Sequence, residues 1–344
     1  MSNRTERRPL VEIATDGQQT VCPDVKPPEV TDKASFLKAI RESGLVGMGG
    51  ASFPTHVKLA PKQKVDTLAI NAAECEPYIT SDYRQMVEAP DEVLDGVLQV
   101  MRWLEIPKAV IGIEQTSPRP SASSPKRLPP IRRFGWRHCP PPTPRAQKRC
   151  SSIIRCRIVG EGQLPADQGV IVMNVSSVAF VSRYLKTGMP LVERMLTVDG
   201  DVIGNPCNVV VPMGTPVRDV LAFAQCDLER AKKLLYGGPM MGICIPDVAD
   251  PILKANNAIL AFEKILDTKP SACIHCGRCL EHVPCGSCPR RSPSIPPEGF
   301  GGAGRTQGHA LHELRLLHLC LSGKASGGRD QPARQELYMN SIKK

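Results

Sequence analysis

The sequence predicts an α/β protein with a parallel-sheet domain, then a small α+β module, then a cysteine-rich segment. Three observations indicate this order. Apolar runs of strand length alternate with stretches of helical spacing before residue 190. From residue 191 the strand-like runs are short and joined by turns. Cysteines then recur at every third position within residues 273–279. Successive strand, helix and strand of these lengths are typical of a parallel sheet.

The parallel-sheet domain is expected to span residues 31–190, after a flexible polar tail at residues 1–30. Thr31 and Asp32 precede an amphipathic stretch, which predicts a capped helix ending near residue 43. The remaining apolar patterns predict strands at 65–70, 108–113 and 169–174, and helices at 90–104 and 177–187.

Residues 116–160 interrupt this pattern. Residues 116–150 contain nine prolines among many serines and arginines, without periodicity. Proline donates no backbone hydrogen bond, and this composition cannot bury a core. We therefore expect a disordered insertion here.

The net charge of +10 also comes from this insertion. Eleven Lys and Arg residues and no acidic residue lie between Glu114 and Glu161, so the rest of the chain has a net charge of −1. Phe134 and Trp136 are its only aromatic residues, too few for a base-stacking platform. A charge confined to one insertion argues against a nucleic-acid partner.

A second module is predicted over residues 191–250, with strand-like runs at 196–202 and 208–212 and a short helix at 217–224. Residues 251–290 form the cysteine-containing segment, and residues 291–344 are expected to be an irregular tail. No run of 18 apolar residues occurs, so we expect no transmembrane helix.

A glycine-rich turn at Gly44–Lys58 is the first candidate binding site. Gly47, Gly49 and Gly50 allow the backbone to approach a ligand, and successive N–H groups can bind a phosphate. Lys58 can add a positive charge. A glycine cluster alone is also compatible with an ordinary turn.

Polar residues at a strand end give the second candidate. Asn71 follows the strand at 65–70, and Glu74 and Glu76 follow soon after. Ligands bind at such strand ends in parallel sheets. Asn71 could bond a ring carbonyl, and the two glutamates could bind sugar or ribityl hydroxyls. A solvated turn would explain the glutamates alone, but together with the glycine loop they favour a flavin or nucleotide.

Cys273, Cys276 and Cys279 form a C-x₂-C-x₂-C run, the pattern that holds three corners of a [4Fe–4S] cluster. Zinc sites usually use two separated pairs, so a cluster is favoured over zinc. The bacterial pattern would place the fourth cysteine at Val283. Cys285 is our candidate for that ligand. Cys288, His282 and a site with three ligands are the alternatives.

Several segments together resemble the C subunit of the Rnf/Rsx ion-translocating ferredoxin:NAD oxidoreductase complex, which in turn resembles the flavin subunit of respiratory complex I. They occur in the family's order: Gly44–Lys58, Asn71–Met86, Val170–Val181, Asp199–Leu221, Tyr236–Gly242 and Cys273–Cys279. The family has two ferredoxin-like cysteine runs, whereas this chain has one. The resemblance covers roughly residues 31–115 and 164–284.

The resemblance implies FMN as a cofactor, NADH as a substrate and one [4Fe–4S] cluster, the second being lost. Gly47, Gly49, Gly50 and Lys58 would hold the phosphate, and Asn71, Glu74, Glu76 and Asn174 would orient the flavin or nicotinamide. No side chain need act as a catalytic acid or base. Residues 191–250 would be a soluble-ligand-binding β-grasp module, and the cysteine segment would be ferredoxin-like.

The implied function is electron transfer between NADH, FMN and iron–sulfur clusters in support of ion translocation. The implied partners are Rnf/Rsx-type membrane subunits and ferredoxin or an iron–sulfur subunit, at the cytoplasmic face of the inner (plasma) membrane. A soluble flavin/iron–sulfur reductase of the cobalamin-reductase type is the alternative enzyme. A zinc-binding module and an inactive assembly component are the non-enzymatic alternatives.

Overall fold

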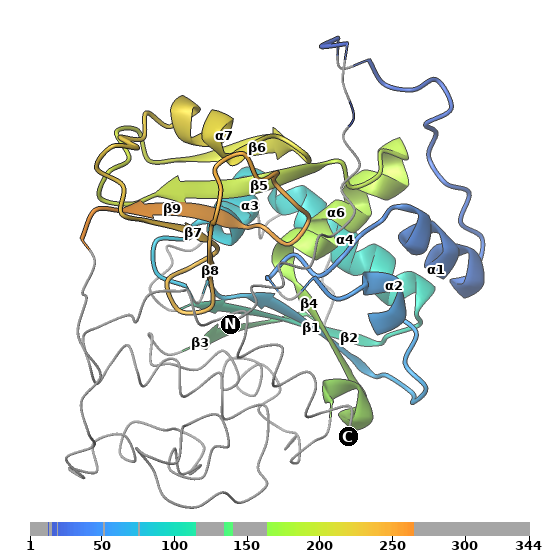
Figure 1. Ribbon diagram of the computed structural model, residues 1–344. Helices are drawn as coiled ribbons and strands as arrows, with labels where there is room; N and C mark the ends of the chain where they lie inside the picture. Colours follow the sequence, from blue (N-terminus) through green and yellow to red (C-terminus); the bar gives the residue numbers. More distant parts are fainter. Residues whose placement is uncertain are drawn as a thin grey trace, which may run out of the picture.

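The computed structural model describes residues 13, 16–18, 20–50, 52–74, 76–114, 134–139 and 164–264. These residues form two sheets, each with its own hydrophobic core (Figure 1). The mixed five-stranded sheet, drawn in yellow-green to orange, lies beside the parallel four-stranded sheet, drawn mainly in blue to green (Figure 1).

The parallel sheet has the strand order β3-β2-β1-β4. Its strands are β1 (Thr67–Ala72), β2 (Lys108–Glu114), β3 (Phe134–Cys139) and β4 (Val170–Asn174). All three pairings are parallel, which confirms the predicted sheet. The register places Asn71 beside Asn174, so the polar ends of β1 and β4 meet at one edge.

Helices cover the face of this sheet that carries Leu68 and Ile70. Asp32 caps the first helix as predicted, because its side chain accepts a hydrogen bond from the Ser35 N–H. The helices are α1 (Lys33–Glu42), α2 (Thr55–Lys58), α3 (Ser81–Glu88), α4 (Pro90–Trp103), the 3₁₀ turn η2 (Pro165–Gln168) and α6 (Val175–Thr187).

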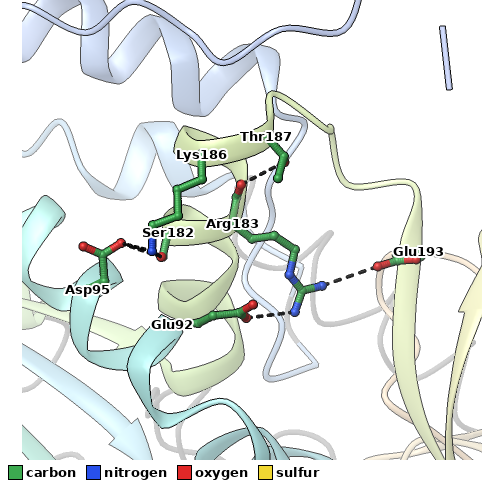
Figure 2. A network of polar contacts seen from close by, with 7 residues as sticks. All are labelled: Glu92, Asp95, Ser182, Arg183, Lys186, Thr187 and Glu193. Atoms are coloured by element: carbon green, nitrogen blue, oxygen red, sulfur yellow. Dashed lines mark hydrogen bonds and ion pairs between the residues drawn. The ribbon is translucent and has the colours of Figure 1, made fainter.

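Helices α4 and α6 pack closely at Gly96. A Cβ atom at Gly96 would overlap the Val178 carbonyl, so only glycine allows this approach. On the surface of the same helix pair, Arg183 contacts Glu92 of α4 and Glu193 of the next strand (Figure 2). The interface between α4 and α6 therefore combines close backbone packing at Gly96 with an ion pair at its surface.

Strand β3 differs from the sequence prediction. Residues 116–160 were expected to lack regular structure, but Phe134–Cys139 pairs in parallel with β2 over six residues. The ladder partner supplies backbone hydrogen bonds that local composition cannot reveal. The rest of this segment lies outside the described residues.

The second sheet has the order β6-β5-β9-β7-β8, with α7 (Val217–Phe223) packed on it. Its strands are β5 (Glu193–Asp199), β6 (Cys207–Pro212), β7 (Lys233–Tyr236), β8 (Ile243–Cys244) and β9 (Ala258–Phe262). β5 and β9 are parallel, and the other pairs are antiparallel. The strands and α7 support the predicted α+β module, although β9 lies beyond its predicted end at residue 250, in the predicted cysteine-containing segment. The β-grasp assignment stays a prediction.

No helix in the described part of the chain has both the length and the apolar character needed to cross a bilayer.

Candidate functional site

The glycine-rich segment forms a tight loop that closes on itself. The Gly47 N–H donates to the Phe53 carbonyl at 2.8 Å, and the Ser52 N–H donates to the Gly47 carbonyl at 3.2 Å. Gly50 has a φ of +101°, which favours glycine. A Cβ atom at Gly50 would meet nothing within 4 Å, so the tip of the loop faces open space.

Lys58 lies beside this loop, at the end of α2. A Cβ atom built on Gly47 would lie 3.9 Å from the Lys58 Nζ. The structure thus brings the predicted cation to the predicted glycines, which the sequence separates by a turn and a short helix.

The N-terminus of α6 meets the same loop. Asn174 caps this helix, and its Oδ1 accepts hydrogen bonds from Ser176 N–H at 2.9 Å and Ser177 N–H at 3.2 Å. A Cβ atom on Gly49 would lie 3.5 Å from the Asn174 Nδ2. The Met48 N–H donates to the Ser177 Oγ at 2.9 Å, which fastens the loop to the helix.

Much of the polar capacity of Asn71 and Asn174 is already used within the protein. Asn71 Oδ1 accepts from the Ala73 N–H at 3.2 Å. Asn174 Nδ2 donates to Asp82 Oδ2 at 2.6 Å. Because an amide nitrogen has two N–H groups, Asn174 keeps one donor for a ligand.

Glu74 and Glu76 have partners in different parts of the fold. Glu74 Oε2 accepts from the Asp82 N–H at 3.3 Å. Glu76 Oε2 accepts from the Met240 N–H at 2.9 Å, in the loop between β7 and β8 of the second module. Burial raises the pKa of the Glu76 carboxyl, and the N–H groups of Met240 and Met241 oppose that rise. Glu76 therefore joins the two modules.

Gly238 explains how Glu76 fits there. A Cβ atom at Gly238 would overlap the Glu76 side chain, so the glycine leaves the space that the carboxylate occupies. Glu76 Oε1 is buried and has no hydrogen-bond partner among the described residues. A buried acceptor without a hydrogen bond destabilises the folded protein. A ligand hydroxyl that donated a hydrogen bond to this oxygen would remove that cost.

Two charged residues of the site were not assigned a role from the sequence. Asp82 accepts hydrogen bonds from Asn174 Nδ2 and from Ser176 Oγ, each at 2.6 Å. Arg194 donates from Nη2 to the Met48 carbonyl at 3.0 Å. For Arg194 the sequence offered one signal, because an arginine occupies an inward-facing position of the β5 strand pattern. That pattern indicates burial but does not identify the hydrogen-bond partner.

The donor groups suit a flavin phosphate. No described residue accepts a hydrogen bond from the N–H of Gly49 or Gly50. Ser52 Oγ, in the same loop, is buried and lacks a partner in the described part of the chain. Gly49 lies beside Asn174 at the N-terminus of α6, and helix N-termini attract anions.

The structure does not test the predicted ligands of the iron–sulfur cluster. Cys273, Cys276, Cys279 and Cys285 fall outside the described residues. Within the ranges that the structure describes, no group of three or more potential metal-ligating side chains occurs. The iron–sulfur assignment therefore stays a prediction from the sequence.

The segment that contains the glycine loop resembles an FMN-binding domain. Residues 40–131 match the family model described as the Nuo51 FMN-binding domain. An NAD⁺-reducing [NiFe]-hydrogenase in its H₂-reduced state matches with a TM-score of 0.56 and 19% identity, over 67% of this chain and 47% of that one. At this identity the likeness supports the fold alone.

Curated relatives of higher identity identify the family more specifically. The C subunit of the proton-translocating ferredoxin:NAD(+) oxidoreductase complex of Clostridium ljungdahlii is 41% identical, over 72% of this chain and 55% of the relative. The Na(+)-translocating counterpart of Acetobacterium woodii is 36% identical, over 81% and 64%. The C subunit of the ion-translocating oxidoreductase complex of Pseudomonas aeruginosa is 34% identical, over 82% and 38%.

The chain belongs to the family of C subunits of ion-translocating ferredoxin:NAD(+) oxidoreductase complexes. It spans between 38% and 64% of the length of these three relatives.

Proposed function

We propose that this chain is the electron-transfer subunit of a membrane-associated ferredoxin:NAD oxidoreductase complex and carries electrons between NADH, FMN and [4Fe–4S] clusters. One observation carries the proposal. The glycine-rich loop, Lys58 and the capped N-terminus of α6 converge at the carboxyl ends of β1 and β4. Names of the relatives point to ion translocation by the whole complex.

The residues of the chain have binding and positioning roles in this proposal. Gly49 and Gly50 present backbone N–H groups to the phosphate, Gly47 closes the loop around it, and Lys58 neutralises its charge. Bound FMN supplies the redox chemistry, because it takes two electrons from NADH and releases them singly. Asn174 offers its remaining N–H to the flavin. No side chain is required to transfer a proton.

Asn71, Glu74 and Glu76 shape the edge on which the flavin or nicotinamide lies. Asn71 keeps acceptor capacity after its internal hydrogen bond, since an amide oxygen has two lone pairs. Glu76 Oε1 is buried, and no described residue donates a hydrogen bond to it. A ribose or ribityl hydroxyl is a donor of suitable size.

Cys273, Cys276, Cys279 and Cys285 are proposed to ligate a [4Fe–4S] cluster, on the strength of their spacing. The proposed partners are the membrane subunits of the complex and ferredoxin or an iron–sulfur subunit. The proposed location is the cytoplasmic face of the inner membrane. The relatives are all named as C subunits of such complexes, so they favour this role over a soluble reductase.

Calorimetric titration of the full chain with FMN and with riboflavin tests the flavin site. We expect FMN to bind more tightly than riboflavin, because only FMN has the phosphate. Lys58→Met should weaken FMN binding about 10-fold, the usual effect of losing one charge-assisted hydrogen bond, without changing riboflavin binding. A folded chain that binds neither compound would refute the proposal.

Anaerobic purification with membrane fractions tests the wider role. Co-purification with membrane subunits, and NADH-driven reduction of an artificial acceptor after reconstitution with FMN and iron–sulfur, are expected. Failure to co-purify with any membrane subunit, in a chain that still reduces the acceptor, would favour the soluble reductase. Absence of NADH-driven reduction in a folded, flavin-loaded chain would favour an inactive assembly component. Zinc in place of iron and sulfide would exclude the cluster.

A further inference from the structure

Arg194 belongs to β5 in the second sheet, yet its side chain reaches the glycine-rich loop of the first domain. Its Nε donates to the Asn256 carbonyl and its Nη2 to the Met48 carbonyl, both at 3.0 Å. Arg194 is 2% exposed and is the only charged residue that the fold buries so completely within the described ranges. Burying a charge is unfavourable unless hydrogen bonds and a counter-charge compensate.

The Arg194 hydrogen bond fixes the direction of one peptide group. The Met48 carbonyl and the Gly49 N–H belong to the same planar peptide, and a trans peptide directs them to opposite sides. Because Arg194 holds the Met48 carbonyl toward the interior, the Gly49 N–H is directed away from Arg194. The Met48 N–H is held separately by Ser177 Oγ, at 2.9 Å.

The Arg194 charge also favours the ionised form of Asp82, which binds the N-terminus of α6. Asp82 receives hydrogen bonds from Asn174 and Ser176 and so fixes the cap of this helix. Burial raises the pKa of Asp82, whereas those two hydrogen bonds and the Arg194 charge oppose the rise. Burial lowers the pKa of Arg194 to about 10, and Asp82 counteracts this, so Arg194 is a cation at neutral pH.

We propose that Arg194 is a positioning residue of the flavin site. By holding Met48, it orients the Gly49 N–H and, through the Met48–Ser177 hydrogen bond, the N-terminus of α6. The second module, which supplies Arg194, is then required for the phosphate-binding geometry. This inference deepens the proposed FMN function and rests on it.

Two variants of the full chain separate the two effects. Arg194→Lys keeps the charge near Asp82, but a single ammonium cannot reproduce the planar fork that reaches two carbonyls. Arg194→Met removes the charge as well. Arg183→Met is the matched control, because Arg183 also connects the first domain to β5 but lies on the surface, away from the loop.

Amide hydrogen exchange in the flavin-free protein is the first measurement. In Arg194→Lys we expect the Met48 amide to exchange about 10-fold faster, a local opening that leaves β1 residues 68–70 unchanged. In Arg194→Met the Ser177 amide should also exchange faster, because the α6 cap loosens. Arg183→Met should change neither amide.

Fluorescence titration is the second measurement. Arg194→Lys should raise the Kd for FMN about 10-fold, as expected for one charge-assisted hydrogen bond, while the Kd for riboflavin stays unchanged. A purely structural arginine would weaken both ligands alike.

The outcomes are distinguishable. A folded Arg194→Lys variant with parental Met48 exchange overturns the positioning role, and so does faster exchange throughout the chain. Should the parent bind no FMN, the proposed function fails, whereas the exchange data still decide whether Arg194 orders the loop. If Arg194→Met does not fold, Arg194→Lys alone decides.

Discussion

Two arginines join the first domain to strand β5, one on the surface and one in the interior. Arg183 of α6 contacts Glu92 at 3.0 Å and Glu193 at 3.4 Å, and 38% of its side chain is exposed (Figure 2). Arg194 bonds two carbonyls and is 2% exposed. Glu193 and Arg194 are neighbours on β5, and successive strand residues point to opposite faces.

The comparison teaches that solvent access, more than the number of contacts, sets the importance of a charged side chain. Water screens the Arg183 pairs and would solvate the partners if one were lost. Arg194 is 2% exposed, so its removal leaves the Asn256 and Met48 carbonyls without their hydrogen-bond donor in a place that water does not reach. The glycine-rich loop depends on the buried arginine, because Arg194 donates a hydrogen bond to the Met48 carbonyl of that loop.

Removing the buried arginine should have the largest effect. Arg194→Met should lower the free energy of unfolding by about 3–5 kcal/mol, because two buried hydrogen bonds from a charged group, each worth about 1.5–3 kcal/mol, are lost. Urea unfolding followed by circular dichroism measures it. Adding Asp82→Asn should recover part of this loss, because a neutral side chain at position 82 does not depend on the Arg194 charge. A loss below about 1 kcal/mol, typical of an exposed pair, would erase the contrast between the two arginines.

The interface beneath Arg183 should depend on packing more than on its ion pairs. Gly96→Ala should lower the free energy of unfolding by about 1–3 kcal/mol, because the new methyl group overlaps the Val178 carbonyl. Thermal and urea unfolding measure the change. Helix propensity alone would make this substitution stabilising by about 1 kcal/mol, so a more stable variant would contradict the close packing of α4 and α6.

Glu76 gives an intermediate case, because its carboxyl is largely buried and has no cation in hydrogen-bond contact among the described residues. Its pKa is raised in the folded state by burial. The carboxyl therefore contributes stability below its ordinary pKa of 4.5, and this contribution is lost as the pH rises through the raised value. Glu76→Gln should remove this loss and be about 1 kcal/mol more stable than the parent at pH 8.

Urea unfolding of both proteins between pH 4 and pH 8 measures the Glu76 effect. The advantage of the variant should grow with pH. A constant difference, or one that grows toward acid, would show that Glu76 is not held as a buried carboxylate by the 237–242 loop.

Removing the exposed arginine should have the smallest effect. Arg183→Met should lower the free energy of unfolding by about 0–1 kcal/mol, the usual value for surface pairs. The difference should shrink further in 1 M salt, because the ions screen exposed charges. A loss comparable to that of Arg194→Met would show that the Figure 2 network matters as much as the interior.

Local patterns were enough to predict much of the first domain. The strands at 65–70, 108–113 and 169–174 correspond to β1, β2 and β4, shifted by at most two residues. Their apolar runs are long enough to be buried on both faces, which parallel sheets require. The helix cap at Asp32 was predictable for a similar reason, since capping involves residues three positions apart.

Strand β3 and helix α3 were missed because their local sequences are not distinctive. Phe134–Cys139 lies among prolines and arginines and becomes a strand by pairing with β2. Ser81–Glu88 has only three buried residues, and its contacts with α6 and β5 come from distant parts of the chain. In both cases tertiary contacts outweigh local propensity.

The sequence by itself determined the elements of the parallel sheet, the glycine loop with its lysine and the asparagines at the strand ends, because these depend on backbone conformation and short-range periodicity. Only the tertiary structure decided that Asp82 would hold the α6 cap and that Arg194 would hold Met48, 146 residues away. Charges find partners through space, and the burial that makes those partners matter exists only once both sheets are in place.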